Sequence, residues 1–242
     1  MTIQDVMAIM SDSLEGTAFD LTKGLAGGPF GSPDRYMGGA GEHKVAGNWE
    51  RPIALFRTSD SYVIQSRSWL PDDRGGVIWF GPHAAHATVY VPFTIGMLRL
   101  PEAYSIGNPW KLSRGSAYWA HRYVENLANL RWKDMIQDIR LAKQELMQVS
   151  QELLEELDKA STMPPAQVTL RLVENAKYVV QRWWLLADEL MEKYADGNVN
   201  GVAQGYPAWW LKAVGFPSGP PPAPPPSTSH TSDWSFFDVV IS

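Results

Sequence analysis

The most informative segment of the chain is Glu15–Tyr36, which reads EGTAFDLTKGLAGGPFGSPDRY. It places glycine-rich turns and a Gly-Pro-Phe-Gly sequence within one short segment. Glycine tolerates positive φ and close backbone approach, and proline fixes φ near about −65°. The segment therefore predicts an irregular loop held in one defined conformation, and such loops often carry binding or catalytic residues.

Four charged residues flank these turns: Asp20, Lys23, Asp34 and Arg35. An arginine fork binds a carboxylate through two hydrogen bonds, and Asp or Lys can orient the polar ends of a substrate. The same residues also fit a purely structural role, in which Asp20 caps a turn and Arg35 forms an ion pair. Spacing alone does not decide between these alternatives.

Composition excludes several kinds of chemistry. The 242-residue chain has a net charge of −5 and no run of Lys or Arg, so we expect no nucleic-acid partner. It contains no cysteine, which excludes disulfides, thiolate-bound zinc and a cysteine nucleophile within these residues. Phosphate-binding glycine motifs and a Gly-x-Ser-x-Gly nucleophile turn are also absent from the sequence, and we expect no cofactor.

The N-terminal residues predict a helix rather than a targeting signal. Met1–Met10 lacks a basic region and a continuous apolar core, and no apolar run in the chain approaches the roughly 20 residues of a membrane span. We expect a soluble chain, with its compartment left open. One face of an amphipathic helix is formed by Ile3, Val6, Met7, Met10 and Leu14. Because this helix leads directly into the specialised loop, we expect an upstream portion to be missing.

Residues 55–96 predict an antiparallel meander. Ser61–Leu70 alternates in the manner of a strand, Pro71–Gly76 is a turn, and Val77–Phe80 and Thr88–Phe93 supply two further short strands. Neither face of the first strand is purely apolar. We therefore expect side chains on both faces of the sheet to make contacts.

A long αα-hairpin is predicted over about 116–196. A helix is expected from Ser116 to about Ala160, and Pro164-Pro165 interrupts the pattern before a second helix that ends near Gly197. The apolar stripe of the second helix is formed by Leu172, Ala176, Val179, Trp183, Ala187, Leu190 and Tyr194. After residue 216 the sequence becomes a Pro-rich linker and tail, residues 217–242, which is expected to be disordered. Residues 1–216 are thus expected to form the folded part.

Three histidines are candidate metal ligands: His83, His86 and His121. His83 and His86 are three residues apart in a loop after a proline, a geometry that does not by itself provide a third ligand. The pattern favours solvent-facing histidines, and we expect no metal site. Tryptophans on the helices are expected to pack in the core.

Several segments together resemble the C69 family of dipeptidases and its secernin relatives. The resemblance runs in one collinear order through most of residues 1–216. It is carried by Glu15–Tyr36, by RTSDSYVIQSRSWLPDDRGGVIWFGP (Arg57–Pro82), by YVPFTIG (Tyr90–Gly96), by SRGSAYWAHRYVENLANLRW (Ser113–Trp132) and by YPAWWLKAVGF (Tyr206–Phe216).

The resemblance implies an α+β fold, the αββα sandwich of N-terminal-nucleophile hydrolases, of which this chain would be the C-terminal part. It also implies hydrolysis of dipeptides or short peptides by a cysteine at the mature amino terminus, whose own α-amino group is the base. An α-amino group suits this role because its ordinary pKa lies near about 8. By position in the family motif, Asp20, Lys23 and Arg35 are expected to line the substrate pocket.

The absence of cysteine departs from that pattern. No catalytic residue is assigned in this chain, and Thr2, the alternative nucleophile, lies at the start of a helix rather than on a strand. We expect a dipeptidase portion that is inactive alone, so whether the chain itself is an enzyme stays open. The alternative is a non-enzymatic, secernin-like interaction protein that forms homo-oligomers through the αα-hairpin. A third possibility is that half a sandwich does not fold stably by itself.

Overall fold

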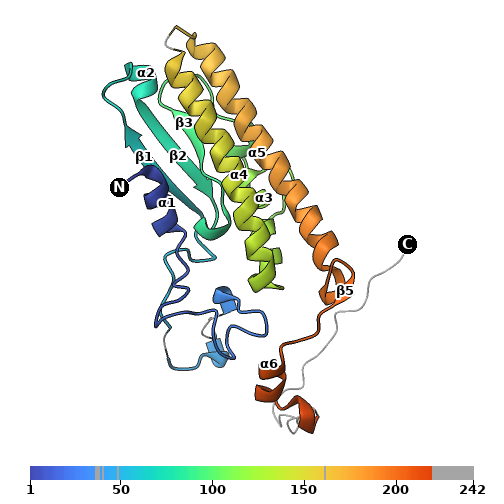
Figure 1. Cartoon of the computed structure of the whole chain (residues 1–242). Helices are drawn as coiled ribbons and strands as arrows, with labels where there is room; N and C mark the ends of the chain where they lie inside the picture. The colour runs from blue at the N-terminus through green and yellow to red at the C-terminus, as the bar shows by residue number, and fades with distance from the viewer. Residues whose placement is uncertain (36–38, 40, 48, 161, 220–242) are drawn as a thin grey trace, which may run out of the picture. The chain divides into compact units, whose positions relative to one another are not determined.

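A computed structural model describes residues 1–35, 39, 41–47, 49–160 and 162–219, and these form a mixed helical and β-sheet structure (Figure 1). The chain divides into two units, residues 1–206 and a smaller unit that begins at residue 207. The mixed composition agrees with the predicted α+β class. Most of the predicted Pro-rich tail, from residue 220 onward, lies outside the described residues.

A three-stranded antiparallel sheet forms where the meander was predicted. Its strands are β1 (Asp60–Ser66), β2 (Gly76–Pro82) and β3 (Val91–Thr94), in the order β1-β2-β3. β1 ends earlier than the predicted Leu70, because the chain turns through the short helix α2 (Asp72–Gly75) before β2 begins. β1 and β2 pair in an antiparallel register that places Ile64 opposite Ile78, so these two side chains lie on the same face of the sheet.

The described part of the first unit holds four helices of eight or more residues: α1 (Ile3–Met10), α3 (Ala117–Ala128), α4 (Trp132–Lys159) and α5 (Pro165–Tyr194). The prediction of one continuous helix from Ser116 to about Ala160 was wrong, because residues 129–131 separate α3 from α4. Arg131 leaves helical geometry at φ −152° and ψ 60°. The amide of Lys133 then donates to the carbonyl of Phe30, 2.9 Å away, so the glycine-rich loop caps the start of α4.

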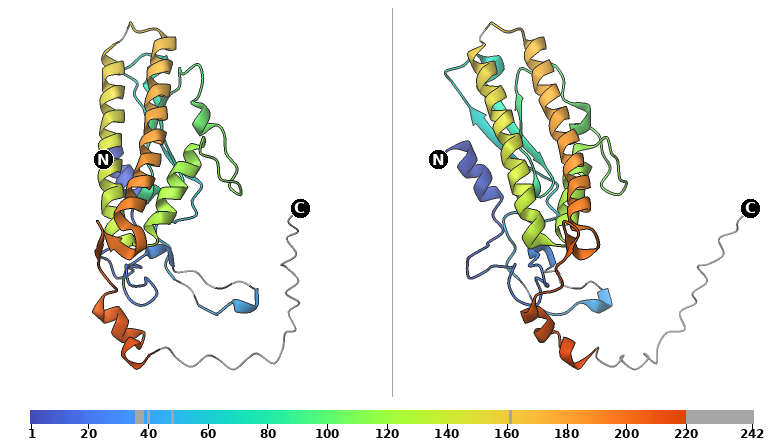
Figure 2. Two further views of the ribbon diagram at one scale, coloured as in Figure 1. Left: turned by 90° about the vertical axis from the view of Figure 1, so that its right-hand side faces the viewer. Right: turned by 45° about the vertical axis from the view of Figure 1, so that its right-hand side comes forward.

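The main core joins these helices to β3. α4 and α5 lie side by side, and β3 packs against both helices (Figures 1 and 2). Val91 and Phe93 of β3 pack in one cluster with Trp132 and Ile136 of α4 and Trp183 of α5. Both tryptophans are fully buried, as the sequence predicted. Among the described helices, none combines the length and the apolar character that crossing a membrane requires.

The amphipathic helix α1 covers a second, smaller cluster. Met7 packs there with Val77, Trp79 and residues of the neighbouring elements. Thr2 is the N-cap of α1: its hydroxyl accepts from the amide of Asp5 at 3.1 Å, and the Asp5 carboxylate accepts from the amide of Thr2 at 2.6 Å. Thr2 therefore lies at a helix start, as expected from the sequence.

Arg74 ties the turn before β2 to the far end of α4. Its buried guanidinium donates to the carbonyls of Leu157 at 2.7 Å, Ala160 at 2.5 Å and Met163 at 2.5 Å. These carbonyls belong to the last turn of α4 and the segment after it, where backbone acceptors lack helical donors. One side chain thus satisfies backbone acceptors at the C-terminal end of α4.

Shorter elements complete the described chain. In the first unit these are η1 (Pro33–Arg35), η2 (Gly41–His43), η3 (Ala85–Ala87), η4 (Glu102–Tyr104), η5 (Ala195–Gly197), β4 (Asn198–Val199) and β5 (Val202–Ala203). The described part of the second unit holds α6 (Ala208–Ala213) and η6 (Phe216–Ser218).

Candidate functional site

The glycine-rich loop is held by close backbone contacts. Gly28 and Gly31 have φ of 72° and 64°, in the left-handed region that favours glycine. A Cβ at Gly31 would lie 2.8 Å from the carbonyl oxygen of Thr22, so no larger residue fits without a shift of the backbone. The loop leads into η1, where Asp34 is buried.

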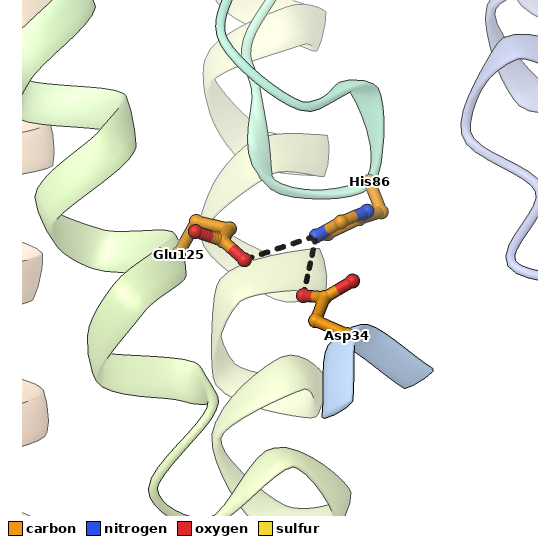
Figure 3. Close-up of side chains that lie close together, drawn as sticks. All are labelled: Asp34, His86 and Glu125. Carbon is orange, nitrogen blue, oxygen red and sulfur yellow. Dashed lines mark ion pairs between the residues drawn. The ribbon is translucent and has the colours of Figure 1, made fainter. Parts of the chain in front are cut away.

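Asp34 belongs to a buried polar cluster that sequence separation conceals. His86 comes from η3, between β2 and β3, and Glu125 comes from α3 (Figure 3). The His86 Nε2 atom lies 3.9 Å from an Asp34 carboxylate oxygen and 3.9 Å from a Glu125 carboxylate oxygen. Asp34, His86 and Glu125, which we call the Asp-His-Glu cluster, are all buried.

The protonation state of His86 follows from its surroundings. Its Nδ1 atom lies 3.0 Å from the carbonyl oxygen of Ala54, which can only accept a hydrogen bond, so Nδ1 carries the proton. Burial lowers the pKa of His86, although the nearby Asp34 carboxylate opposes this effect. Nε2 is therefore an unprotonated acceptor. Among the described residues, neither Nε2 nor either Asp34 carboxylate oxygen has a hydrogen-bond partner.

Glu125 is held in place by amide side chains. Burial, with the neighbouring Asp34 carboxylate as a second cause, raises the pKa of Glu125 to about 10. Its carboxyl accepts from Asn129 Nδ2 at 2.9 Å and from Asn126 Nδ2 at 3.1 Å. The side-chain amide oxygen of Asn129 (Oδ1) in turn accepts from the Ser32 hydroxyl at 2.5 Å. A hydrogen-bonded chain therefore connects the glycine-rich loop to Glu125.

The expectation that the loop histidines His83 and His86 face solvent was wrong, because both are buried. His121, on α3, is buried as well. The segment between β2 and β3 is rich in alanine and packs against α3 and α4, which brings its histidines inside. Desolvation lowers the pKa of His83 to about 3 and that of His121 to about 4. His83 Nε2 lies 3.8 Å from Glu125, whereas His121 stacks on Trp183 at 5.2 Å.

The other charged loop residues are not part of this cluster. The Asp20 carboxylate accepts from the amides of Gly16 and Thr22, each at 2.9 Å, which is the turn-capping role. Lys23 Nζ is 3.9 Å from Asp20, and 79% of its side chain is exposed. Arg35 is exposed, and its guanidinium lies against the backbone of Gly28. The structure thus separates Asp34 from the three residues with which the sequence grouped it.

Two hollows adjoin these elements. One, of about 720 Å³, is lined by Leu21 and Pro33 of the loop region and by the cations Lys44, Arg51 and Arg57. The other, of about 600 Å³, lies between α1 and α4 and has His86 and Lys143 in its wall. Burial lowers the pKa of Lys143 to about 7, and its amine donates to Ala85 O at 2.7 Å and Ser11 Oγ at 2.9 Å.

Comparison with known proteins now bears on the whole arrangement. A family model described as Peptidase family C69 matches residues 1–145, a span that contains the glycine-rich loop, the sheet and the Asp-His-Glu cluster. The chain belongs to peptidase family C69. A curated relative from Latilactobacillus sakei, named "Probable dipeptidase", is 28% identical over 121 residues, which is 50% of this chain. The chain spans about 22% of the length of that relative.

Within this C69 chain, Glu125 is the cluster member that the sequence analysis missed. Charged residues on a helix are usually solvated, and on α4 Glu145, Glu152, Glu155 and Glu156 are indeed exposed. A signal was nevertheless present: Glu125 follows Ala117 and His121 at spacings of four, on the same face of α3. A carboxylate on the buried stripe of a helix indicates a paired or functional group.

Proposed function

We propose that this C69 chain contributes the substrate-binding and scaffold portion of a cysteine-type dipeptidase. Its nucleophile, an amino-terminal cysteine with its own α-amino group as base, would lie outside these 242 residues. The observation that carries the proposal is the family match over residues 1–145, in a chain without any cysteine. The name of the Latilactobacillus sakei relative supports a dipeptide as substrate.

An uncovered face of the sheet supports the two-sheet architecture of this proposal. Tyr62 and Ile64 of β1 and Ile78 of β2 share one face and are 55%, 66% and 44% exposed. Opposed apolar side chains on a sheet normally pack against another layer. A second sheet of an αββα sandwich would cover them.

The cation-lined hollow next to the loop suits the carboxylate of a short peptide. Lys44, Arg51 and Arg57 contribute to its wall, and guanidinium groups bind carboxylates through paired hydrogen bonds. We propose that the exposed Lys23 and Arg35 face the same substrate, while Asp20 supports the loop that carries them.

The experiment compares dipeptide hydrolysis by the chain alone with hydrolysis by a fusion. In the fusion, the chain follows the segment that precedes the matched region in the Latilactobacillus sakei protein. Hydrolysis only by the fusion, together with a raised KM in the Arg51→Ala fusion, is the expected result. A fusion that unfolds cooperatively yet releases no amino acid would overturn the proposal. The control for contaminating peptidases is a fusion in which alanine replaces the amino-terminal cysteine that this proposal requires.

A second candidate function is a non-enzymatic, secernin-like interaction protein. It is favoured by apolar side chains that are exposed on α4 and α5, including Leu141 at 61% and Leu185 at 56%. Such side chains fit contacts with a second copy or with another helix. Sedimentation of the chain as a monomer at high concentration, unchanged by Leu185→Glu, would remove the support for this candidate.

A further inference from the structure

We infer that Asp34, His86 and Glu125 bind a divalent first-row transition-metal ion, such as Zn²⁺ or Mn²⁺. This inference is independent of the proposed peptidase mechanism, in which a cysteine and an amine perform the chemistry. It rests on the arrangement of donors, on their charge and on their separation.

The atoms of the three side chains that could bind a metal ion face one another. His86 donates through Nδ1 to the carbonyl of Ala54, so its Nε2 lone pair points toward the two carboxyl groups (Figure 3). Facing acceptors repel unless a proton or a cation lies between them, and a metal ion can serve all three groups at once. Metal-binding histidines commonly donate their other ring N–H to a backbone carbonyl, as His86 does here.

The charge of the cluster also calls for a cation. Two carboxyl groups come together in the interior with a neutral imidazole, and a buried uncompensated carboxylate is costly. Neither Asp34 oxygen has a hydrogen-bond partner within the described part of the chain. A divalent ion would compensate both carboxylates and give the Asp34 oxygens and His86 Nε2 their missing partner.

The separations are close to those of a metal site. The donor atoms of Asp34, His86 and Glu125 all lie within 4.8 Å of one another. Zinc lies about 2.0–2.2 Å from nitrogen and oxygen ligands, so two ligands at a tetrahedral angle are about 3.4 Å apart. The observed 3.9 Å from Nε2 to each carboxylate therefore needs a contraction of about half an ångström. One imidazole with two carboxylates suits zinc, manganese or iron better than a soft ion.

The surroundings supply orientation and access. The amides of Asn129 and Asn126 fix the Glu125 carboxyl, and Ser32 fixes Asn129, as outer groups do around bound metals. His86 lies in the wall of the hollow of about 600 Å³ between α1 and α4, which offers a route from solvent.

The test uses the full 242-residue chain, treated with EDTA and then dialysed against Zn²⁺, Mn²⁺ or Co²⁺ in separate samples. Elemental analysis of the dialysed protein is expected to find close to one ion per chain. Thermal unfolding is expected to shift to higher temperature with the ion. The Co²⁺ sample is expected to show visible absorption typical of a nitrogen and oxygen ligand set.

Asp34→Asn, His86→Gln and Glu125→Gln are each expected to weaken binding by more than about 10-fold. The control is His121→Gln, which changes an equally buried histidine outside the cluster and is expected to retain the ion. Glu125→Gln keeps the shape of the side chain, so its circular dichroism spectrum distinguishes loss of binding from loss of fold. Wild-type chain that retains no ion after dialysis, or equal binding by wild type and Glu125→Gln, would overturn the inference.

Discussion

Replacing His121 by phenylalanine is expected to remove a large part of the acid sensitivity of the fold. His121 is fully buried on α3, with its ring stacked on Trp183 at 5.2 Å and an interplanar angle of 25°. Its Nδ1 atom lies 2.8 Å from the carbonyl oxygen of Ala117, and its Nε2 has no hydrogen-bond partner among the described residues. Phenylalanine fills a similar volume and retains the ring stacking.

The magnitude follows from the difference between folded and unfolded pKa values. Desolvation lowers the pKa of His121 from 6.5 to about 4 in the folded chain. As pH falls below 6.5 the unfolded chain binds a proton that the folded chain does not bind until about pH 4, so stability decreases over this interval. At 1.36 kcal/mol for each pH unit, His121 alone removes about 3 kcal/mol between these limits.

The assay is urea unfolding followed by circular dichroism at several pH values from 8 to 4. Wild type is expected to lose about 3 kcal/mol more of its unfolding free energy than His121→Phe over this range. His121→Gln is the matched control, because it cannot titrate but packs less well. Both variants should show the same shallower pH dependence, whatever their stabilities at pH 8. Parallel loss of stability in wild type and both variants would refute the reasoning.

Three other substitutions probe the fold by urea unfolding. The lowered pKa of Lys143 makes the unfolding free energy of the wild type rise between pH 7 and pH 10.5, by up to about 5 kcal/mol. Lys143→Met is expected to raise stability at pH 7 and to abolish this rise. An unchanged pH profile would contradict this. Arg74→Met leaves buried carbonyls without donors and is expected to lower the unfolding free energy by about 3 kcal/mol or more. The control, Arg57→Met, changes an exposed arginine and should alter stability by less than about 0.5 kcal/mol. Similar losses in both variants would count against the capping role of Arg74. Gly96→Ala places a Cβ 2.5 Å from a backbone oxygen and should lower the unfolding free energy by about 2 kcal/mol. In the control, Gly115→Ala, the new Cβ meets nothing closer than 3.5 Å, so stability should hardly change. Equal stability of the two variants would refute the steric argument.

Local patterns were sufficient for elements that local interactions stabilise. α1 begins at its Thr2 cap and presents the apolar face that the three- and four-residue spacing predicts. The three strands occur where alternation and turn residues indicate them.

The break between α3 and α4 could not be predicted in this way, because its cause is tertiary. Arg131 stacks on the Phe30 ring at 4.2 Å and donates to Asp134 at 2.5 Å.

The candidate site was less predictable than the fold. The family was correctly predicted from the glycine-rich loop together with the later motifs, and Asp34 lies in that loop. His86 was interpreted as exposed because a loop with proline and histidine usually faces water. Its burial depends on the small alanines around it and on packing of η3 against α1, α3 and α4, which no local pattern encodes. Asp20, Lys23 and Arg35 stay predictions as substrate-pocket residues.

The hydrogen bond from the Lys133 amide to the Phe30 carbonyl has a consequence for measurement. The amide of Lys133 lies in the first turn of α4, where no preceding helical carbonyl is available, so its partner comes from the glycine-rich loop. Its rate of hydrogen–deuterium exchange should therefore report departure of the loop rather than fraying of the helix. A single backbone amide thus serves as an internal probe of whether the glycine-rich loop is in place, without any label on the loop itself.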